Sequence, residues 1–265
     1  MSDFLLELYS EEIPPNLQIS ARNELCEKVK NDLVNDGLKF DTIKSYSTPT
    51  RLTIVIKNLL ERIKIPSKEI KGPKLGVVED ILNNFLNAHG ASKKELFQKQ
   101  IEKGSFYFIK TKSKEIFIQD TLIKIILNSI ASIRWKKSMK WSDKELLWGR
   151  PLRSILAIYK GKTLRFNYGH LKSNNLTYID KNLEEESKKI LSFEDYLKYL
   201  KKNEIILDHQ EREKKIVSKI NNICNLKGFS NFYETKLLNE VVNIVDSPHV
   251  LLAEFNKKYL ELPKE

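Results

Sequence analysis

The chain has 265 residues, which is enough for one large domain or two of ordinary size. Lysine and arginine number 46 against 35 acidic residues, so the formal net charge is +11, a surplus that favours a polyanionic partner such as nucleic acid. The two cysteines, Cys26 and Cys224, match no disulfide or metal-binding spacing, which is typical of a protein in a reducing compartment.

Two apolar runs bear on targeting and on membrane insertion. The opening, MSDFLLELYSEEIPP, becomes acidic within a few residues, and its apolar run is too short for a signal peptide. The run TLIKIILNSIASI carries Lys124 and Asn128 and is too short to span a bilayer. We therefore expect a cytoplasmic protein with no membrane partner.

The first region, residues 1–65, predicts a strand-helix-strand-strand unit with one sheet face covered. Residues 4–9 form the first strand, and residues 42–47 and 51–59 form two more, joined by a short turn. Gly37 is placed to end the helix. The helix itself is predicted by apolar residues that recur every four positions: Leu17, Ala21, Leu25, Val29 and Leu33.

A loop rich in Pro, Gly and Lys marks the start of the second region, residues 66–265. Residues 77–90 predict a helix, and Ser92 with Glu95 forms a capping box that opens another. Residues 105–112 and 115–118 are expected to pair as a hairpin, followed by a helix over 120–135.

The remainder of the chain continues the alternation of helices and strands. Residues 154–169 predict a second hairpin that turns at Gly161. Ser192 and Asp208 look like N-caps of two polar helices, with a strand at 203–208 between them. Residues 241–255 predict a helix, a turn and a strand. The expected fold class is α+β, with mixed or antiparallel sheets covered by helices in two lobes.

No motif predicts a catalytic residue or a metal site. Residues 160–163 imitate the end of a phosphate-binding loop, but Leu156 stands where that loop needs glycine, so a hairpin turn is the better interpretation. The four histidines lack ligand spacing. Glu11 and Glu12 are adjacent on an extended segment, so their carboxylates point to opposite sides and share no site.

The stretch 134–156 carries all three tryptophans with cations between them. It is either a platform for nucleic acid or a helix end that packs its rings and exposes its charges. We expect Ile126, Ile130 and Ile133 to pack inward and the later tryptophans, Trp141 and Trp148, to cover a sheet edge. The candidate tRNA-binding cations in this stretch are Lys136, Lys137, Lys140, Arg150 and Arg153.

Three further cations are candidates for phosphate contacts. Arg51 begins a predicted strand, where it could hold a phosphate or pair with a neighbouring acid. Lys71 and Lys74 precede a predicted helix, whose free N–H groups could help to hold a phosphate, although an ordinary solvated loop explains them as well.

Six stretches, in order, resemble the β subunit of the bacterial tetrameric glycyl-tRNA synthetase. FLLELYSEEIPP is similar to that family's LLxEIGTEELPP, and YSTPTRLTIVIKNL to its TPRRLAxxVxxL segment. IKGP matches a KGP loop, KSMKWSDKELLWGRPLRSILAIY resembles KxMRWG…FxRPxxWxxxL, and HLKSNNLTY is similar to the stretch before GHRF. NEVVNIVDSPHVLLAEFNKKYLELPKE resembles EVxxLVExPxVxxGxFxxxFLxLPxE. The resemblance covers residues 4–265, and its specificity lies in the order and spacing of the six segments.

Some positions depart from the family pattern. Lys140 stands where the family has arginine, and residues 179–182 stand where it has GHRF. The chain stops inside a motif that continues in the family, so the resemblance implies an N-terminal portion that lacks the helical HD-type and anticodon-binding domains.

The resemblance implies a division of labour. In this family the α subunit holds the class II site that activates glycine, and the complex, a heterotetramer, uses ATP and Mg. The β subunit binds tRNA and completes the assembly. The expected function is therefore a non-catalytic tRNA-binding and assembly segment of glycine–tRNA ligase, with the α subunit and tRNA(Gly) as partners and no cofactor in this chain. A stand-alone basic RNA-binding module without synthetase activity is the alternative. A hydrolase acting on mischarged tRNA is a weaker one, because no acid/base pair is visible.

Overall fold

The structure, a computed structural model, describes residues 2–65, 67–102, 104–111, 113–140, 146–181, 184–256 and 258–259. It divides into two compact units: unit 1 combines Met1–Leu60 with Gln119–Glu265, and unit 2 is Glu61–Ile118. The boundary expected between residues 65 and 66 lies near the junction at Leu60 and Glu61. The second junction, at Ile118 and Gln119, where the chain returns to unit 1, was not predicted. Unit 2 is an insertion into unit 1.

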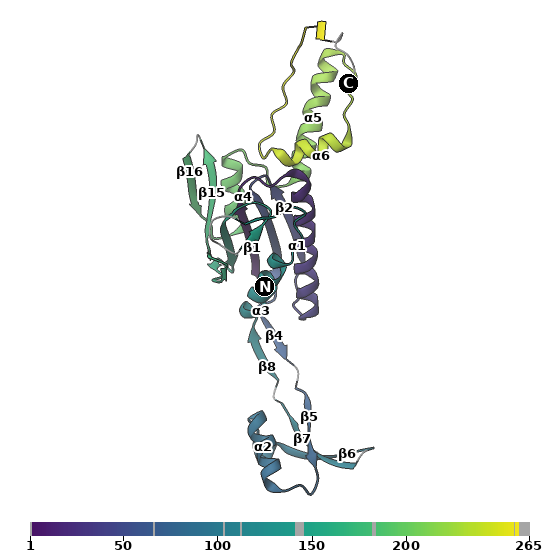
Figure 1. Cartoon of the computed structure of the whole chain (residues 1–265), viewed down its shortest axis with the longest axis vertical. Coiled ribbons are helices and arrows are strands. Elements are labelled where there is room, and N and C mark those ends of the chain that lie inside the picture. Colours follow the sequence, from purple (N-terminus) through teal and green to yellow (C-terminus); the bar gives the residue numbers. More distant parts are fainter. Residues whose placement is uncertain are drawn as a thin grey trace. The chain divides into compact units, whose positions relative to one another are not determined.

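Unit 1 is built on a seven-stranded sheet (Figure 1). Its strands, in order across the sheet, are β13 (Asn167–Tyr168), β14 (Leu171–Asn174), β11 (Leu152–Tyr159), β1 (Ser2–Ser10), β3 (Arg51–Leu59) and β2 (Thr42–Thr48), with β12 (Lys162–Thr163) paired to β11. β1 pairs antiparallel with β3 and β11, so Leu6 lies opposite both Ile54 and Ala157. The sheet is mixed, because β11 and β14 run parallel while the other neighbours are antiparallel.

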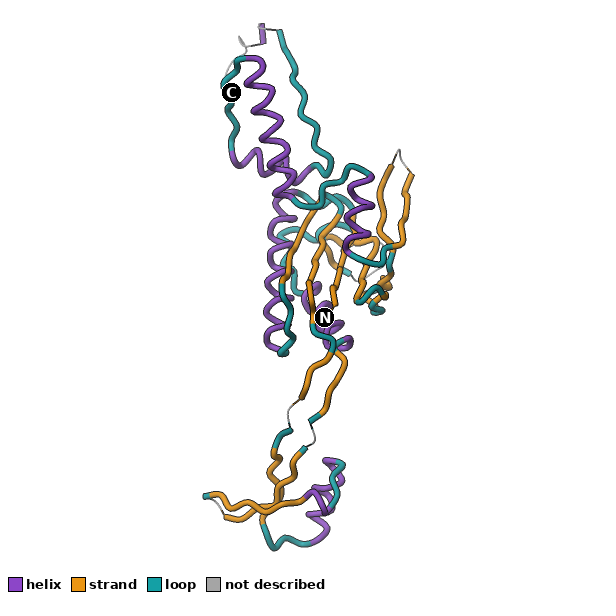
Figure 2. The backbone as a smooth tube through the Cα atoms, turned by 180° about the vertical axis from the view of Figure 1, so that it is seen from behind, coloured by secondary structure: helices purple, strands orange, loops and turns teal. Residues whose placement is uncertain are grey.

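Layers cover both faces of this sheet (Figure 2). The covering elements are α1 (Pro15–Asn35), α3 (Gln119–Ala131), α4 (Phe193–Lys202) and the hairpin of β15 (Leu176–Lys181) and β16 (Glu184–Lys189). α1 packs on β2, β3 and α3. On the opposite face, Leu5 and Val55 join Tyr196 and Leu200 of α4 in one apolar cluster. The sequence predicted that only one face of the sheet is covered. The structure shows that α4 covers the other face as well.

The α1 helix forms as predicted. Its recurring apolar residues, Leu17 to Leu33, are at most 8% exposed. Gly37 has φ 71°, and the Leu38 N–H donates to the Leu33 carbonyl, which ends the helix as expected. The helix expected over 120–135 ends earlier, at Ala131. The Ser132 hydroxyl donates to the Ser129 carbonyl, and such local bonds compete with helix continuation.

The last part of unit 1 contains α5 (His209–Lys227) and α6 (Thr235–Ile244). Ser192 and Asp208 accept from backbone N–H groups and are the N-caps of α4 and α5, as predicted. The strand predicted over 203–208 is wrong. Arg212, fully buried, donates to the carbonyls of Ile206 and Leu207, and the Ile206 N–H donates to the Asp246 carbonyl, so this segment bonds to a side chain and a loop in place of a β ladder. The strand expected at the end of residues 241–255 is also absent, and residues 251–255 lie exposed.

The hairpin over 154–169 is confirmed in its turn: β11 pairs with β12 around Lys160 and Gly161, both with positive φ. The chain then departs from a simple hairpin, because β14 returns to pair parallel with β11. The β15–β16 hairpin was not predicted.

Unit 2 contains a two-stranded and a three-stranded sheet. Its elements are β4 (Arg62–Ile65), β5 (Glu69–Lys74), α2 (Glu79–His89), a 3-10 turn (Lys93–Glu95), β6 (Leu96–Ile101), β7 (Gly104–Lys110) and β8 (Lys114–Phe117). The helix over 77–90 is confirmed as α2. The capping box at Ser92 is present, but it opens only the 3-10 turn. The hairpin predicted between 105–112 and 115–118 is wrong, because β8 pairs with β4 while β7 pairs with β5 and β6.

Candidate nucleic-acid interface

The segment that follows α3 is held in place by its aromatic rings. The Trp135 and Trp148 ring centroids lie 4.9 Å apart, and Trp148 is 1% exposed. Gly149 lies against the Trp135 ring, so closely that an added Cβ would overlap it. Two short strands, β9 (Met139–Lys140) and β10 (Leu147–Trp148), pair antiparallel beside it. The rings of Trp135 and Trp148 therefore pack on each other, and Trp135 also packs on Gly149.

The apolar part of the prediction for this stretch is confirmed. Ile126, Ile130 and Ile133 are at most 7% exposed, and Trp148 is buried as expected. Trp141 lies outside the described residues. The two interpretations offered by the sequence are thus compatible, because packed rings can hold exposed cations in a fixed place.

The five candidate cations of this stretch differ in whether other protein groups already bind them. Lys136, Lys137 and Lys140 are exposed and have no carboxylate partner among the residues that the structure describes. Arg150 Nε donates to the Glu12 carbonyl at 3.1 Å, and Arg153 lies 2.9 Å from a Glu185 carboxylate oxygen. The three lysines are consequently less engaged by protein groups than the two arginines are.

The two arginines border a cavity of about 510 Å³ at the end of β1. It is also lined by Ser10, Glu11, Glu12 and Thr50. The two carboxylates match the two guanidinium groups in number, so this cavity carries no surplus of positive charge for a polyanion.

Arg51 lies in the interior of unit 1. It is 2% exposed, and its Nε lies 3.2 Å from a carboxylate oxygen of Glu7, which is fully buried. Its other nitrogens donate to the Thr50 hydroxyl and to the Tyr178 carbonyl. A guanidinium in this position is occupied by protein groups, in agreement with the acid-pairing interpretation of the sequence rather than with a phosphate contact.

Glu7 is the centre of a buried polar cluster that the sequence analysis missed. Thr177 and Tyr196 both donate to the carboxylate oxygen that faces Arg51. Burial raises the pKa of Glu7, and Arg51, Tyr196 and Thr177 oppose that rise. The available signal was a charged residue in the middle of the apolar strand FLLELY, because a buried charge requires a partner.

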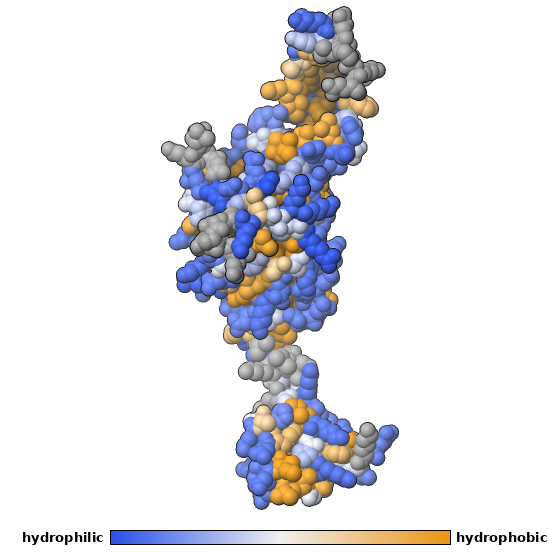
Figure 3. Space-filling model, in the orientation of Figure 1, coloured by the Kyte–Doolittle hydropathy of each residue, from blue (hydrophilic) through white to orange (hydrophobic). Residues whose placement is uncertain are grey.

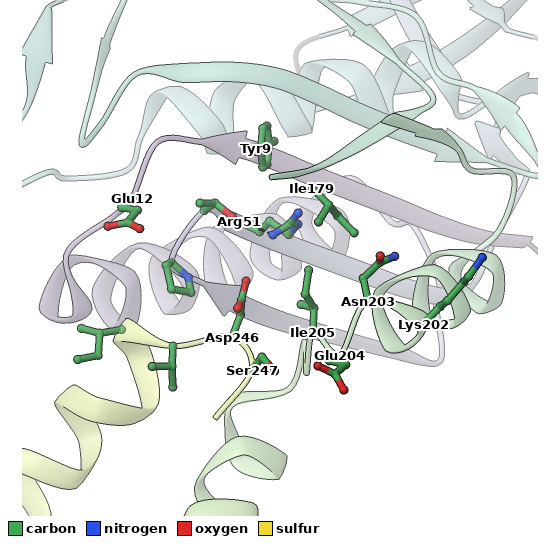
Figure 4. A pocket seen from close by; sticks show the side chains of 14 residues that line it. Tyr9, Glu12, Arg51, Ile179, Lys202, Asn203, Glu204, Ile205, Asp246 and Ser247 are labelled. Carbon is green, nitrogen blue, oxygen red and sulfur yellow. Dashed lines mark hydrogen bonds between the residues drawn. The ribbon is translucent and has the colours of Figure 1, made fainter. Parts of the chain in front are cut away.

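A larger cavity, of about 660 Å³, opens beside Arg51 (Figure 4). The charged residues that line it are the acids Glu12, Glu204 and Asp246 and the cations Arg51 and Lys202. Since Arg51 is already paired with Glu7, the acids dominate this lining. The cavity is therefore unfavourable for phosphate.

Lys71 and Lys74 belong to unit 2 and lie exposed on β5. They precede a helix, α2, as predicted, but the loop interpretation is wrong, because residues 69–74 form a strand that pairs with β7. Lys71 Nζ instead lies 3.7 Å from the Phe106 ring centroid.

The described part of the chain has neither a metal site nor a membrane-spanning helix. No group of three His, Cys, Asp or Glu side chains is placed there to hold a metal ion. None of its helices is both long and apolar enough to cross a bilayer.

Comparison with known proteins identifies the family. Residues 4–265 match the family described as the glycyl-tRNA synthetase beta subunit. The chain belongs to this family, which confirms the resemblance drawn from the six segments.

Curated relatives named glycine–tRNA ligase beta subunit align with 100% of the chain. Those of Rickettsia akari and Rickettsia felis are 35% identical to it, and that of Rickettsia canadensis is 36% identical. The chain spans 40% of the length of each of these relatives.

Proposed function

We propose that the chain is a non-catalytic tRNA-binding and assembly segment of a cytoplasmic glycine–tRNA ligase, with an α subunit as partner in a heterotetramer that uses ATP and Mg. The observation that carries this proposal is the family match over nearly the whole chain. The relatives' printed names describe a ligase subunit, and a β subunit implies an α subunit.

The tRNA contact is assigned to Lys136, Lys137 and Lys140, together with Arg150 and Arg153. Three exposed lysines in the segment that begins at the packed ring of Trp135 support this assignment. Contacts to phosphate release counterions, so the affinity for tRNA should decrease linearly with salt on a double logarithmic scale.

The salt dependence of tRNA(Gly) binding tests this assignment. We expect replacement of all five cations by alanine to lower the slope by about 0.7–0.9 for each phosphate that is no longer neutralised. A matched control removes five lysines from the α4 and α5 surfaces: Lys198, Lys201, Lys202, Lys214 and Lys219. Equal slopes for the two variants would contradict the assignment.

The assembly role is supported by large exposed apolar side chains near α5 and α6, orange in Figure 3. They include Leu226, Phe229, Phe232, Leu237, Leu251 and Phe255. A patch of this kind is typical of a protein contact surface. Co-purification with the α subunit is the direct test. We expect Phe232→Ser with Leu237→Ser to reduce recovery of the α subunit, and full recovery would contradict an interface at this patch.

A further inference from the structure

The three-stranded sheet of unit 2 has one face covered by a helix. Gly72 lies so close to α2 that an added Cβ would be 2.7 Å from Phe85 Cε1, and Ile109, on the same face, is 2% exposed. Because side chains alternate along a strand, Phe108 and Lys71 belong to the opposite face. Within the described part of unit 2, no helix packs on that face.

The register of β5, β6 and β7 gathers rings and lysines on the uncovered face. Phe97 and Lys71 both lie opposite Phe108, and Lys99 and Lys74 both lie opposite Phe106. Residues directly opposite each other in an antiparallel pair share a face. We call this set the aromatic–lysine face: Lys71, Lys74, Phe97, Lys99, Phe106 and Phe108.

The contacts on this face are between rings and between rings and cations. Phe97 and Phe108 stack with centroids 5.9 Å apart and an interplanar angle of 28°. Lys71 Nζ lies 3.7 Å from the Phe106 centroid, and Lys99 Nζ lies 5.8 Å from that of Phe108. Phe97 and Phe106 are half-buried, so each still offers part of its surface to a ligand.

The charge of the face favours a polyanion. Lys99 pairs with Glu69 at 2.8 Å, whereas Lys71 and Lys74 have no carboxylate partner among the residues that the structure describes. Flat rings interleaved with unneutralised cations suit a chain of alternating planar and anionic groups, which is what unpaired RNA presents. Duplex RNA buries its base faces in its own stack, and the Asp and Glu side chains of an acidic peptide carry no aromatic ring that could stack on phenylalanine.

We propose that the aromatic–lysine face binds an unpaired stretch of RNA. Bases stack on Phe97 and Phe106. The ammonium groups of Lys71 and Lys99 turn from the rings to the flanking phosphates, and Lys74 contacts a phosphate beside them. The inference deepens the proposed function and rests on it, since the natural ligand would be an unpaired part of the tRNA. It concerns unit 2 and is independent of the lysines after α3.

Fluorescence anisotropy of the full chain with a labelled ten-nucleotide oligouridylate tests the inference. Stacking contributes about five- to 150-fold in affinity for each base. We therefore expect Phe97→Leu with Phe106→Leu to weaken binding at least fivefold without changing the salt slope. Lys71→Gln with Lys74→Gln should reduce the slope by about 1.4, because these two lysines are unneutralised within the described part of the chain and each single-strand contact contributes about 0.7.

Lys93→Gln with Lys94→Gln is the matched control, because these exposed lysines of the 3-10 turn lie outside the face. We expect this control to change neither the affinity for oligouridylate nor its salt slope beyond the effect of net charge. Crosslinking of 4-thiouridine-labelled RNA to wild-type protein requires no variant, and we expect adducts on peptides containing Phe97 or Phe106. Circular dichroism confirms that each variant is folded.

Three results would overturn the inference: unchanged oligouridylate binding in folded ring variants, crosslinks confined to other peptides, or equal displacement of the RNA by oligoglutamate of the same charge. The proposed function fails separately, through absence of tRNA(Gly) binding by the wild-type chain itself. If tRNA(Gly) binds and its salt slope depends on the five cations after α3 while the oligouridylate does not bind, only the inference for unit 2 is overturned.

Discussion

Arg51 and Glu7 show how much depends on one buried ion pair. We expect Arg51→Met to destabilise unit 1 by about 3–5 kcal/mol, because it leaves the Glu7 carboxylate buried without its counter-charge. Glu7→Gln combined with Arg51→Met should recover most of this loss, since both charges are then gone. Urea unfolding of the single and double variants measures the difference. A single variant as stable as the double variant would mean that the carboxylate is not compensated by Arg51.

His209, the first residue of α5, gives the chain a predictable response to acid. Its pKa is lowered from 6.5 to about 4, first by burial and then by repulsion from Arg22 and Arg212, against the attraction of Asp208. The unfolded chain therefore binds a proton between pH 6.5 and about 4 that the folded chain does not. The free energy of unfolding should fall as the pH drops through this window. Above pH 6.5 the neutral His209 costs the fold nothing, and the stability is at its full value.

The measurement is the urea midpoint at pH 7 and at pH 5. We expect His209→Gln to lose less stability between these two values than wild type does, because the variant lacks the titrating group. His249→Gln, at an exposed histidine, serves as the control and should follow wild type. Parallel losses in wild type and His209→Gln would refute the assignment.

At the scale of elements, the contact between Trp135, after α3, and β10 is the most sharply testable. An added methyl at Gly149 would lie 2.8 Å from Trp135 Cδ2 and closer to two other ring carbons. We expect Gly149→Ala to cost about 1–3 kcal/mol, as overpacking does, and to shift tryptophan emission to longer wavelength as the ring is displaced. Adding Trp135→Leu should relieve the overlap, and a double variant no more stable than Gly149→Ala would argue against this cause.

Elements whose apolar residues repeat with one period could be predicted from the sequence. In α1, Leu17 to Leu33 recur every four positions and are buried together, and β1 and β3 were found from their apolar runs. Pairing partners could not be predicted in the same way. β8 pairs with β4, which is distant in the sequence, and not with β7, the strand that precedes it in the chain. Only the tertiary structure decides that choice.

Side-chain hydrogen bonds account for another failure. The burial of residues 203–208 alternates as in a strand, with Ile205 and Leu207 buried. The carbonyls of Ile206 and Leu207, however, accept hydrogen bonds from Arg212. Among the candidate site residues, the exposed lysines were identifiable as cations, whereas their local setting depends on the packing of Trp135 on Trp148. The burial of Arg51 could only be weighed as an alternative, because its partner Glu7 lies on another strand.

The whole molecule should not activate glycine by itself. Adenylate formation requires groups that hold the ATP phosphates and stabilise charge as pyrophosphate leaves. The cavity beside Arg51 has a mainly acidic lining, which opposes a polyphosphate. We expect no glycine-dependent exchange of pyrophosphate into ATP by the purified chain, and activity only after addition of the α subunit, with the further domains of the relatives where these are required. Exchange by a preparation in which mass spectrometry detects no α subunit would contradict the proposed role.

The central place of β1 in its sheet sets an order of events on the ribosome. β1 is made before both of its neighbours in the sheet, and one of them, β11, is made only after the whole of unit 2. At about 5–20 residues per second, that delay is on the order of ten seconds, during which one side of β1 has no strand to bond to. Both sheets of unit 2 lie within Glu61–Ile118, so all their strands emerge before β11 exists. In a nascent chain the inserted unit can therefore fold first, and the unfinished sheet around β1 is the part that chaperones would need to shield.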